Sequence, residues 1–255
     1  MSVPLLEAVH GLRVAYPDLG LKPLLTKLRE QQPDLGAATT EVREATADAE
    51  ARTAAQSLLR PAYTKLLAEG SWCASQEDWR RAARSCREAI ALRPDEPAAY
   101  YNLGAALTNS GHFVEAAQRH LEAMERYPVG SKDWAQATAC AFDVLRLKDC
   151  DEAAKPEWWS DEGLKALSAS VLRAAPNDEA AIDMRAHVLS GEVGGWEAGT
   201  RSAAELKQAA THYDRSAALC PGSGVELSEA ADWCRSKAEA GRQMEDIPAT
   251  CCCFL

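Results

Sequence analysis

A repeat with a period of 34 residues is the feature that most constrains the fold of this chain. Residues of the same kind recur at this spacing through the middle of the sequence. The matching pairs are Gly70 and Gly104, Trp79 and Phe113, Ala82 and Ala116, Ala89 and Ala123, and Pro94 and Pro128. A fixed period of about 20–50 residues predicts that one small unit is stacked several times along the chain.

The spacing within one unit predicts two helices joined by a short turn. Tyr100, Leu103 and Leu107 recur at i, i+3 and i+7, which places them on one face of a first helix. Gly111 suits the turn between the helices because glycine adopts left-handed backbone conformations without strain. Pro128 ends the second helix, since proline lacks an amide donor and disfavours a helical residue before it.

Small residues and caps complete this unit. Gly104 and Ala116 remove side-chain bulk where the two helices meet. Asp95, which precedes Pro97 by two residues, is predicted to be the N-cap of the first helix. The preceding copy, at about residues 63–96, differs because it has Glu77 where the turn glycine is expected.

The second copy resembles the tetratricopeptide repeat (TPR) consensus: an aromatic residue, Leu103-Gly104, then Gly111 with an aromatic residue two positions later, small residues and Pro128. The resemblance covers about residues 60–221 and is loosest in the third copy, where residues 149–159 resemble an insertion. It implies an all-α solenoid of about four helical hairpins. Later helices are expected at residues 131–146, 161–175, 179–189 and 202–220, with a capping helix at 225–242.

The predicted organisation has three parts. Residues 1–48 form an N-terminal three-helix module, with helices at about 3–15, 22–31 and 40–47. Residues 49–243 form the TPR-like repeat domain and its capping helix. Residues 244–255 form a flexible cysteine-rich tail. Abundant alanine, the best helix former, supports the all-α interpretation.

The N-terminal module resembles the small helix-turn-helix units of some DNA-binding proteins, which leaves a DNA-associated regulator as an alternative function. The acidic residues of the third helix, Glu41 and Glu44 among them, argue against nucleic acid because they repel phosphate. The net charge of −10 has the same effect. A fragment of residues 1–60 that fails to shift duplex DNA at low salt would dismiss the alternative.

The sequence contains no recognisable catalytic motif, so we expect a protein that is not an enzyme and uses no cofactor and no small-molecule substrate. His112 and His120 have no cysteine or carboxylate at metal-ligand spacing, and we expect surface or half-buried histidines and no metal. The six spaced cysteines form no C-x-x-C motif and are expected to pack as small hydrophobic residues. The odd total of nine cysteines fits free thiols in a reducing compartment.

The TPR resemblance implies a concave groove, lined by the first helix of each hairpin, that binds an extended peptide. The candidate groove residues are Tyr101, Asn102, Asn109, Lys132, Gln136 and His187, with Ala105 and Asp183 at neighbouring lining positions. Asparagine and glutamine there would bond a peptide backbone, and Tyr101 would offer a stacking face.

One TPR subclass binds the C-terminal carboxylate of cytosolic chaperones with five clamp residues. Asn102 and Lys132 match two clamp positions, whereas Leu67, Ser71 and Gln136 replace a lysine, an asparagine and an arginine. The chaperone tail is therefore one candidate partner, with two of the five clamp positions matched.

The last four residues, Cys-Cys-Phe-Leu, have the layout of a prenylation motif. Cys252 would carry a geranylgeranyl group and Cys251 a palmitoyl group as the second anchor. We expect a cytoplasmic protein scaffold or adaptor that binds a protein or peptide segment. A co-chaperone tethered to a membrane through this tail is a further alternative.

Overall fold

The computed structural model describes residues 8–9, 11–12, 15–16, 21–31, 39–150, 153–191, 199–220 and 222–245. Every regular element in these residues is a helix, which confirms the all-α class. The chain divides into two compact units, Met1–Lys65 and Leu66–Leu255. This division falls inside one helix, and the boundaries proposed at residues 48 and 243 stay predictions.

The first unit contains α2 (Leu21–Gln31), which begins within one residue of the predicted second helix. Leu24 and Leu28 are one turn apart on α2, and both are buried, as are Val9 and Leu12. The predicted first helix, at residues 3–15, lies mostly outside the described residues.

The long helix α3 (Thr39–Ser75) corrects the predicted third helix, which was expected to end near Ala47. Residues 40–60 contain no glycine and no proline, and they are rich in alanine, glutamate and arginine, so nothing there ends the helix. Pro61 lies inside α3 and removes one amide donor from its ladder without ending it.

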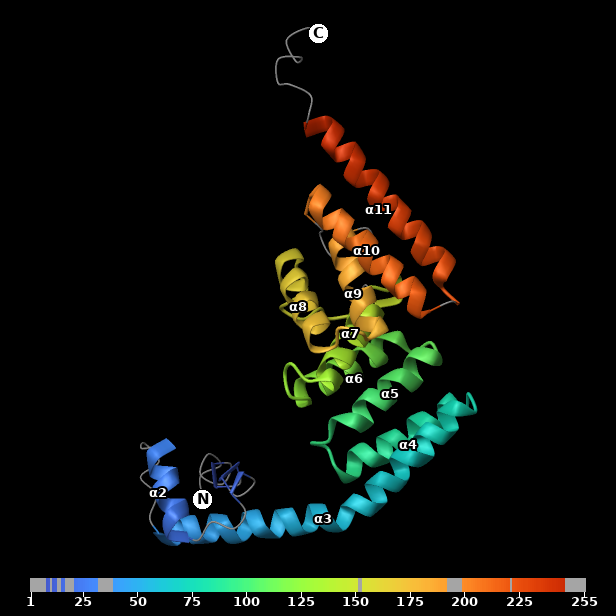
Figure 1. The fold of residues 1–255 in the computed structure, drawn as a ribbon. Coiled ribbons are helices and arrows are strands. Elements are labelled where there is room, and N and C mark those ends of the chain that lie inside the picture. Colours follow the sequence, from blue (N-terminus) through green and yellow to red (C-terminus); the bar gives the residue numbers. More distant parts are fainter. Residues whose placement is uncertain are drawn as a thin grey trace. The chain divides into compact units, whose positions relative to one another are not determined.

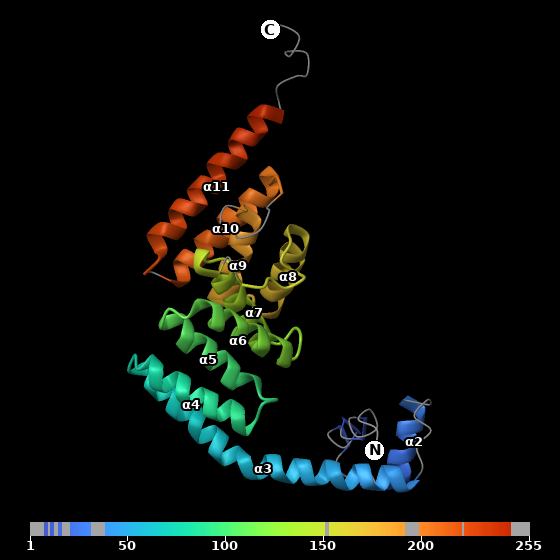
Figure 2. The ribbon, with the colours of Figure 1, turned by 180° about the vertical axis from the view of Figure 1, so that it is seen from behind.

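The second unit contains the last turns of α3 and the helices that follow. Their bounds are α4 (Trp79–Leu92), α5 (Pro97–Asn109), α6 (Phe113–Arg126), α7 (Lys132–Leu145), α8 (Asp161–Ala174), α9 (Glu179–Ser190), α10 (Ala203–Leu219) and α11 (Gly224–Glu245). From α4 onward each helix packs against the next one along the chain (Figures 1 and 2). In addition, α7 contacts α9, which is two helices further along the chain.

Side-chain caps fix most of these helix starts. Ser131 and Asp178 accept the amides of Trp134 and Ala181 at the starts of α7 and α9. The predicted cap of α5 is wrong by one residue: the N-cap is Glu96, with no side-chain hydrogen bond, and Pro97 is the first helical residue. Pro97 explains the shift, since it holds the residue before it in an extended conformation.

The turns at the ends of α3 and α5 have the same unusual backbone conformation. Gly111 has a φ of 77°, and Glu77, which is 34 residues earlier, has a φ of 58°. Glu77 therefore adopts the left-handed region that the repeat pattern assigns to glycine.

The segment between α7 and α8 is irregular, as predicted for an insertion. It begins with a 3-10 turn, η2 (Lys148–Cys150). Trp158 and Trp159 are half-buried and pack against the apolar cores on both sides of this segment. The Lys155 ammonium donates to the carbonyl oxygens of Leu145 and Cys150, at 2.6 and 2.9 Å, which ties the segment to the end of α7.

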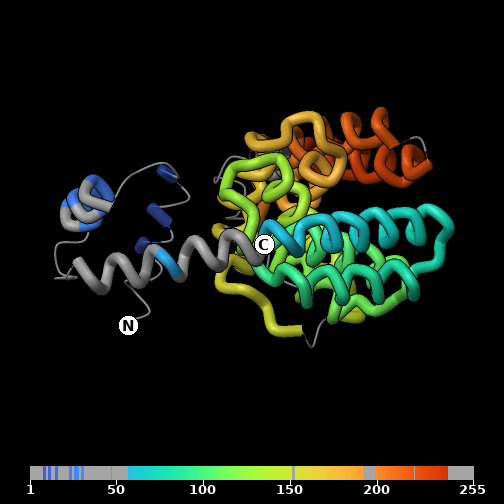
Figure 3. Tube along the Cα trace, turned by 90° about the horizontal axis from the view of Figure 1, so that it is seen from below, coloured from blue at the N-terminus to red at the C-terminus, as the bar shows by residue number. Residues whose placement is uncertain are grey.

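The core of the second unit is built from small side chains. Alanines and four cysteines fill the contacts between helices, which lets the backbones approach closely. Cys73, Cys86, Cys150 and Cys234 are buried, which confirms that they pack as small hydrophobic residues. Cys140 and Cys220 are only half-buried. Figure 3 shows the path of the chain from below the view of Figure 1.

Candidate functional site

A pocket of about 330 Å³ lies among α5, α6, α7 and α9. The last turns of α5 and α7 and the first turns of α9 provide most of its walls, and α6 contributes one residue. The lining residues are Ala105, Thr108, Asn109, His120, Ala139, Cys140, Phe142, Asp143, Val144, Glu179, Ala180, Asp183 and Met184. The pocket thus spans the first helices of three consecutive hairpins.

His120 is the residue that α6 contributes, and it is 2% exposed. It reaches the pocket because Gly104 has no side chain: a β-carbon on Gly104 would lie 2.7 Å from the His120 ring. Burial lowers the pKa of His120 to about 4, so the imidazole is neutral at physiological pH. Among the described residues its Nδ1 has no hydrogen-bond partner. This burial corrects the expectation of a surface or half-buried histidine.

Carboxylates are the charged groups of the pocket lining. Asp143 and Glu179 are exposed, and Asp183 is half-buried. The Arg146 guanidinium forms an ion pair with Asp143 at 2.7 Å, and Nε2 of His187 lies 3.3 Å from Asp183 Oδ2. Asp183 Oδ1 is buried without a hydrogen bond from any described residue. No lysine or arginine is among the described lining residues, so the pocket presents negative charge.

Asn109 lines this pocket, as do Ala105 and Asp183, which were predicted at neighbouring lining positions. The Asn109 amide donates to the Ala105 carbonyl oxygen at 2.8 Å. Tyr101 lies behind the lining. Its ring meets His120 edge-on with centroids 5.5 Å apart, and its hydroxyl lies 3.8 Å from Cys140 Sγ. Burial is the main cause that raises the pKa of Tyr101. Tyr101 therefore supports two lining residues.

The other four predicted residues lie outside the lining. Gln136 Nε2 donates to Asp178 Oδ2 at 2.9 Å, and the Tyr213 hydroxyl lies 2.9 Å from His187 Nδ1. These side chains join α7 to the cap of α9, and α9 to α10. Asn102 is half-buried on α5, and Lys132 is exposed in the first turn of α7.

Two kinds of lining residue were missed from the sequence. His120 comes from a second helix of a hairpin, whereas the prediction drew only on first helices. His120 lies one 34-residue period after Cys86, which is buried, and this equivalence could have indicated that His120 also faces inward. Asp143 and Glu179 come from helix ends that belong to different hairpins, and no spacing rule links such positions.

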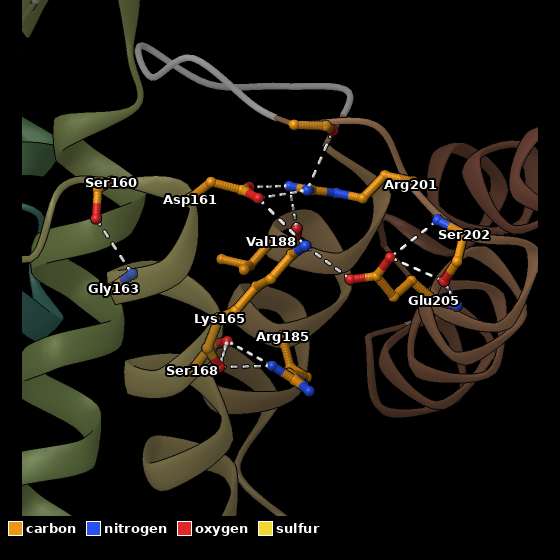
Figure 4. Close-up of polar contacts among 11 residues, drawn as sticks. Ser160, Asp161, Gly163, Lys165, Ser168, Arg185, Val188, Arg201, Ser202 and Glu205 are labelled. Carbon is orange, nitrogen blue, oxygen red and sulfur yellow. Dashed lines mark hydrogen bonds and ion pairs between the residues drawn. The ribbon is translucent and has the colours of Figure 1, made fainter.

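A second polar cluster joins α8, α9 and α10 (Figure 4). The Arg201 guanidinium, whose side chain is 6% exposed, donates to both carboxylate oxygens of Asp161, at 2.6 and 2.9 Å. It also donates to the Val188 carbonyl oxygen at 3.0 Å. Lys165 bridges Asp161 and Glu205, at 3.2 and 2.7 Å.

This cluster balances its charges internally. The hydrogen bond from Arg201 is the largest influence on Asp161 and lowers the pKa of that carboxyl to about 2. Burial alone would raise the pKa of Glu205, but the bonds from Lys165 and Ser202 outweigh it and lower the value to about 2. Since both carboxylates are already bonded to cations, we assign the cluster to holding the three helices together.

Among the described residues, no group of histidine, cysteine and acidic side chains could hold a metal ion. No helix among them is long and apolar enough to cross a membrane. Cys251 and Cys252, the predicted lipidation sites, lie outside the described residues. So do the side chains of Glu41 and Glu44, on which the DNA alternative depends.

The comparisons with known proteins assign no family. No known protein family matches the chain, and no curated protein matches it either.

Proposed function

We propose that this protein is a non-enzymatic scaffold whose second unit is a TPR-like array that binds an extended segment of a partner protein. The observation that carries the proposal is the pocket shared by α5, α7 and α9, the first helices of three consecutive hairpins. A surface built from successive repeats suits an extended ligand, because each repeat adds one contact along the same line.

The 34-residue period and the order of packing support the TPR-like arrangement. Each helix from α4 onward packs on its sequence neighbour, and α7 packs on α9. Gly70 and Gly104, one period apart, each lie against a side chain of the next helix, Cys86 and His120 respectively. Equivalent positions therefore make equivalent contacts in the first two hairpins.

Site-directed photo-crosslinking tests the proposal. A photoreactive phenylalanine analogue would replace Asn109, which lines the pocket and is exposed, in the full chain within extract from the source cells. We expect crosslinks to one contiguous segment of a partner, mapped by mass spectrometry. An added Ala105→Trp change, which fills the pocket, should abolish these crosslinks.

The matched control is Ala240→Trp, at an exposed alanine of α11. It adds the same bulk away from the pocket and should leave the crosslinks intact. Crosslinks that survive Ala105→Trp, or that scatter over many unrelated proteins, would refute a segment-binding groove at this place.

A further inference from the structure

We propose that the α5–α7–α9 pocket holds an arginine or lysine side chain of the bound segment. This inference rests on the proposed groove and adds the chemistry of its ligand. The pocket combines three carboxylates, a buried neutral imidazole and apolar walls, which together match a cation on an aliphatic stem.

The carboxylates supply the charge complementarity. Asp143, Glu179 and Asp183 come from two helices and line the same pocket. Arg146 and His187 each contact one of these carboxylates from outside the described lining. The C-terminal ends of α5 and α7 also face the pocket, and the partial negative charge of a helix C-terminus adds to that of the carboxylates. The first turns of α9 oppose this effect but bring in Glu179 and Asp183 themselves.

His120 is an independent sign of a ligand. The neutral His120 imidazole is 2% exposed, and its Nδ1 has no hydrogen-bond partner among the described residues, which costs free energy unless a ligand reaches it. In the tautomer that carries its proton on Nε2, Nδ1 accepts a hydrogen bond. Arginine and lysine carry only donors, so their head groups satisfy both this nitrogen and the carboxylates. Glutamate or a C-terminal carboxylate would meet three like charges instead.

The pocket is large enough for a long side chain, and its walls suit an aliphatic stem. A volume of about 330 Å³ is at the lower end of the range of about 300–1,000 Å³ for ligand pockets, so it is small for a cofactor. Ala105, Ala139, Ala180 and Met184 provide apolar contacts for the methylene groups of the stem.

The acidic lining also bears on the chaperone-tail hypothesis. The clamp candidate Lys132 begins α7, whereas Asp143 lies eleven residues later, about 16 Å along the helix axis. An acidic tail would therefore find the clamp candidate Lys132 far from the pocket and carboxylates within it. Charge complementarity favours a basic segment.

The methyl group of Met184 provides a direct readout, since Met184 lines the pocket. The full chain, labelled with ¹³C at methionine methyl groups, would be titrated with three blocked tripeptides whose central residue is arginine, norleucine or glutamate between alanines. We expect the arginine peptide to shift the Met184 methyl signal in a saturable manner and to leave the Met124 methyl signal unchanged. The norleucine peptide should bind at least about tenfold more weakly, and the glutamate peptide more weakly still.

A double variant, Asp143→Asn with Glu179→Gln, should bind the arginine peptide about five- to tenfold more weakly. The matched control, Glu125→Gln with Glu239→Gln, removes two charges from exposed glutamates outside the described lining and should bind within about twofold of the original. If the norleucine or glutamate peptide shifts Met184 equally well, the cation preference is overturned while the groove stands. If no peptide shifts the Met184 signal but the Asn109 crosslinks form, only the cation inference is refuted. If neither the Met184 shift nor the Asn109 crosslinks are seen, the proposed groove is refuted as well.

Discussion

The His120 ring lies directly against Gly104, so that a β-carbon at Gly104 would come within 2.7–2.8 Å of three ring atoms. One period earlier, Cys86 Sγ lies 3.2 Å from the equivalent position on Gly70. The same contact thus has a rigid ring in one hairpin and a thiol in the other. This difference lets one substitution be compared in two equivalent places.

Gly104→Ala should lower the free energy of unfolding by about 1–3 kcal/mol, because the buried ring has little room to move. Gly70→Ala should cost less, since a sulfur atom at the end of a short side chain can shift by a few tenths of an ångström. The higher helix propensity of alanine, about 1 kcal/mol, offsets part of the cost in both variants. Urea unfolding followed by circular dichroism measures both values, and equal losses would contradict the packing described.

Glu77 and Gly111 both have a left-handed backbone conformation. Placing glycine at residue 77 and alanine at residue 111 should therefore change the stability in opposite directions. Glu77→Gly should stabilise the chain by about 0.5–1 kcal/mol, because it relieves a left-handed conformation that costs a non-glycine residue about 1–2 kcal/mol. Gly111→Ala should destabilise it by about 1 kcal/mol for the same reason. Space is not a factor at Gly111, since nothing lies within 4 Å of an added β-carbon. If Glu77→Gly lowered the free energy of unfolding instead, the Glu77 side chain would stabilise the fold by more than its left-handed backbone costs.

Asp161→Asn should lower the free energy of unfolding by about 3 kcal/mol at neutral pH, because it leaves the buried Arg201 guanidinium without its carboxylate. Asp232→Asn is the control. Asp232 pairs with Arg235 on α11 but its side chain is 79% exposed, so the loss should stay below about 0.5 kcal/mol. Similar losses in the two variants would contradict a structural role for the cluster in Figure 4.

The same cluster predicts a pH dependence. Asp161 and Glu205 have pKa values of about 2 in the folded chain, below the values of about 4 for unfolded carboxyls. Their stabilisation is therefore complete above about pH 5 and disappears as the pH falls through the folded pKa values. The stability difference between the original chain and Asp161→Asn should shrink steadily from about pH 4 to pH 2. A difference that stays constant over this range would place the folded pKa of Asp161 elsewhere.

Thiol reactivity should separate native from unfolded protein. Burial raises the pKa of Cys86 and of Cys140 to about 11, so very little thiolate is present at neutral pH. Alkylation with iodoacetamide should therefore be slow at both residues in the native chain and fast after denaturation, as measured by peptide mass spectrometry. Rapid native labelling of Cys140 would indicate that the pocket it lines opens more widely than described.

The positions of most helices in the second unit were predictable from local sequence. Proline and the capping residues Ser131, Asp178 and Ser202 mark starts and ends that depend on a few neighbouring residues. Where local signals were absent, as along residues 40–60 of α3, or where Glu96 rather than Asp95 became the cap, the predicted bounds were wrong. The groove residues were placed by analogy to one repeat, and of these positions Ala105, Asn109 and Asp183 line the pocket.

By itself, the sequence determined that the chain is helical and that equivalent positions recur every 34 residues, because both depend on residue type and spacing along one chain. The tertiary structure alone decided which side chains line the pocket and which groups their charges face. Asp143, Glu179 and His120 come from three helices, and their proximity depends on how those helices pack. Gln136 and His187 instead form hydrogen bonds within the protein, because Asp178 and Tyr213 lie close to them in the fold.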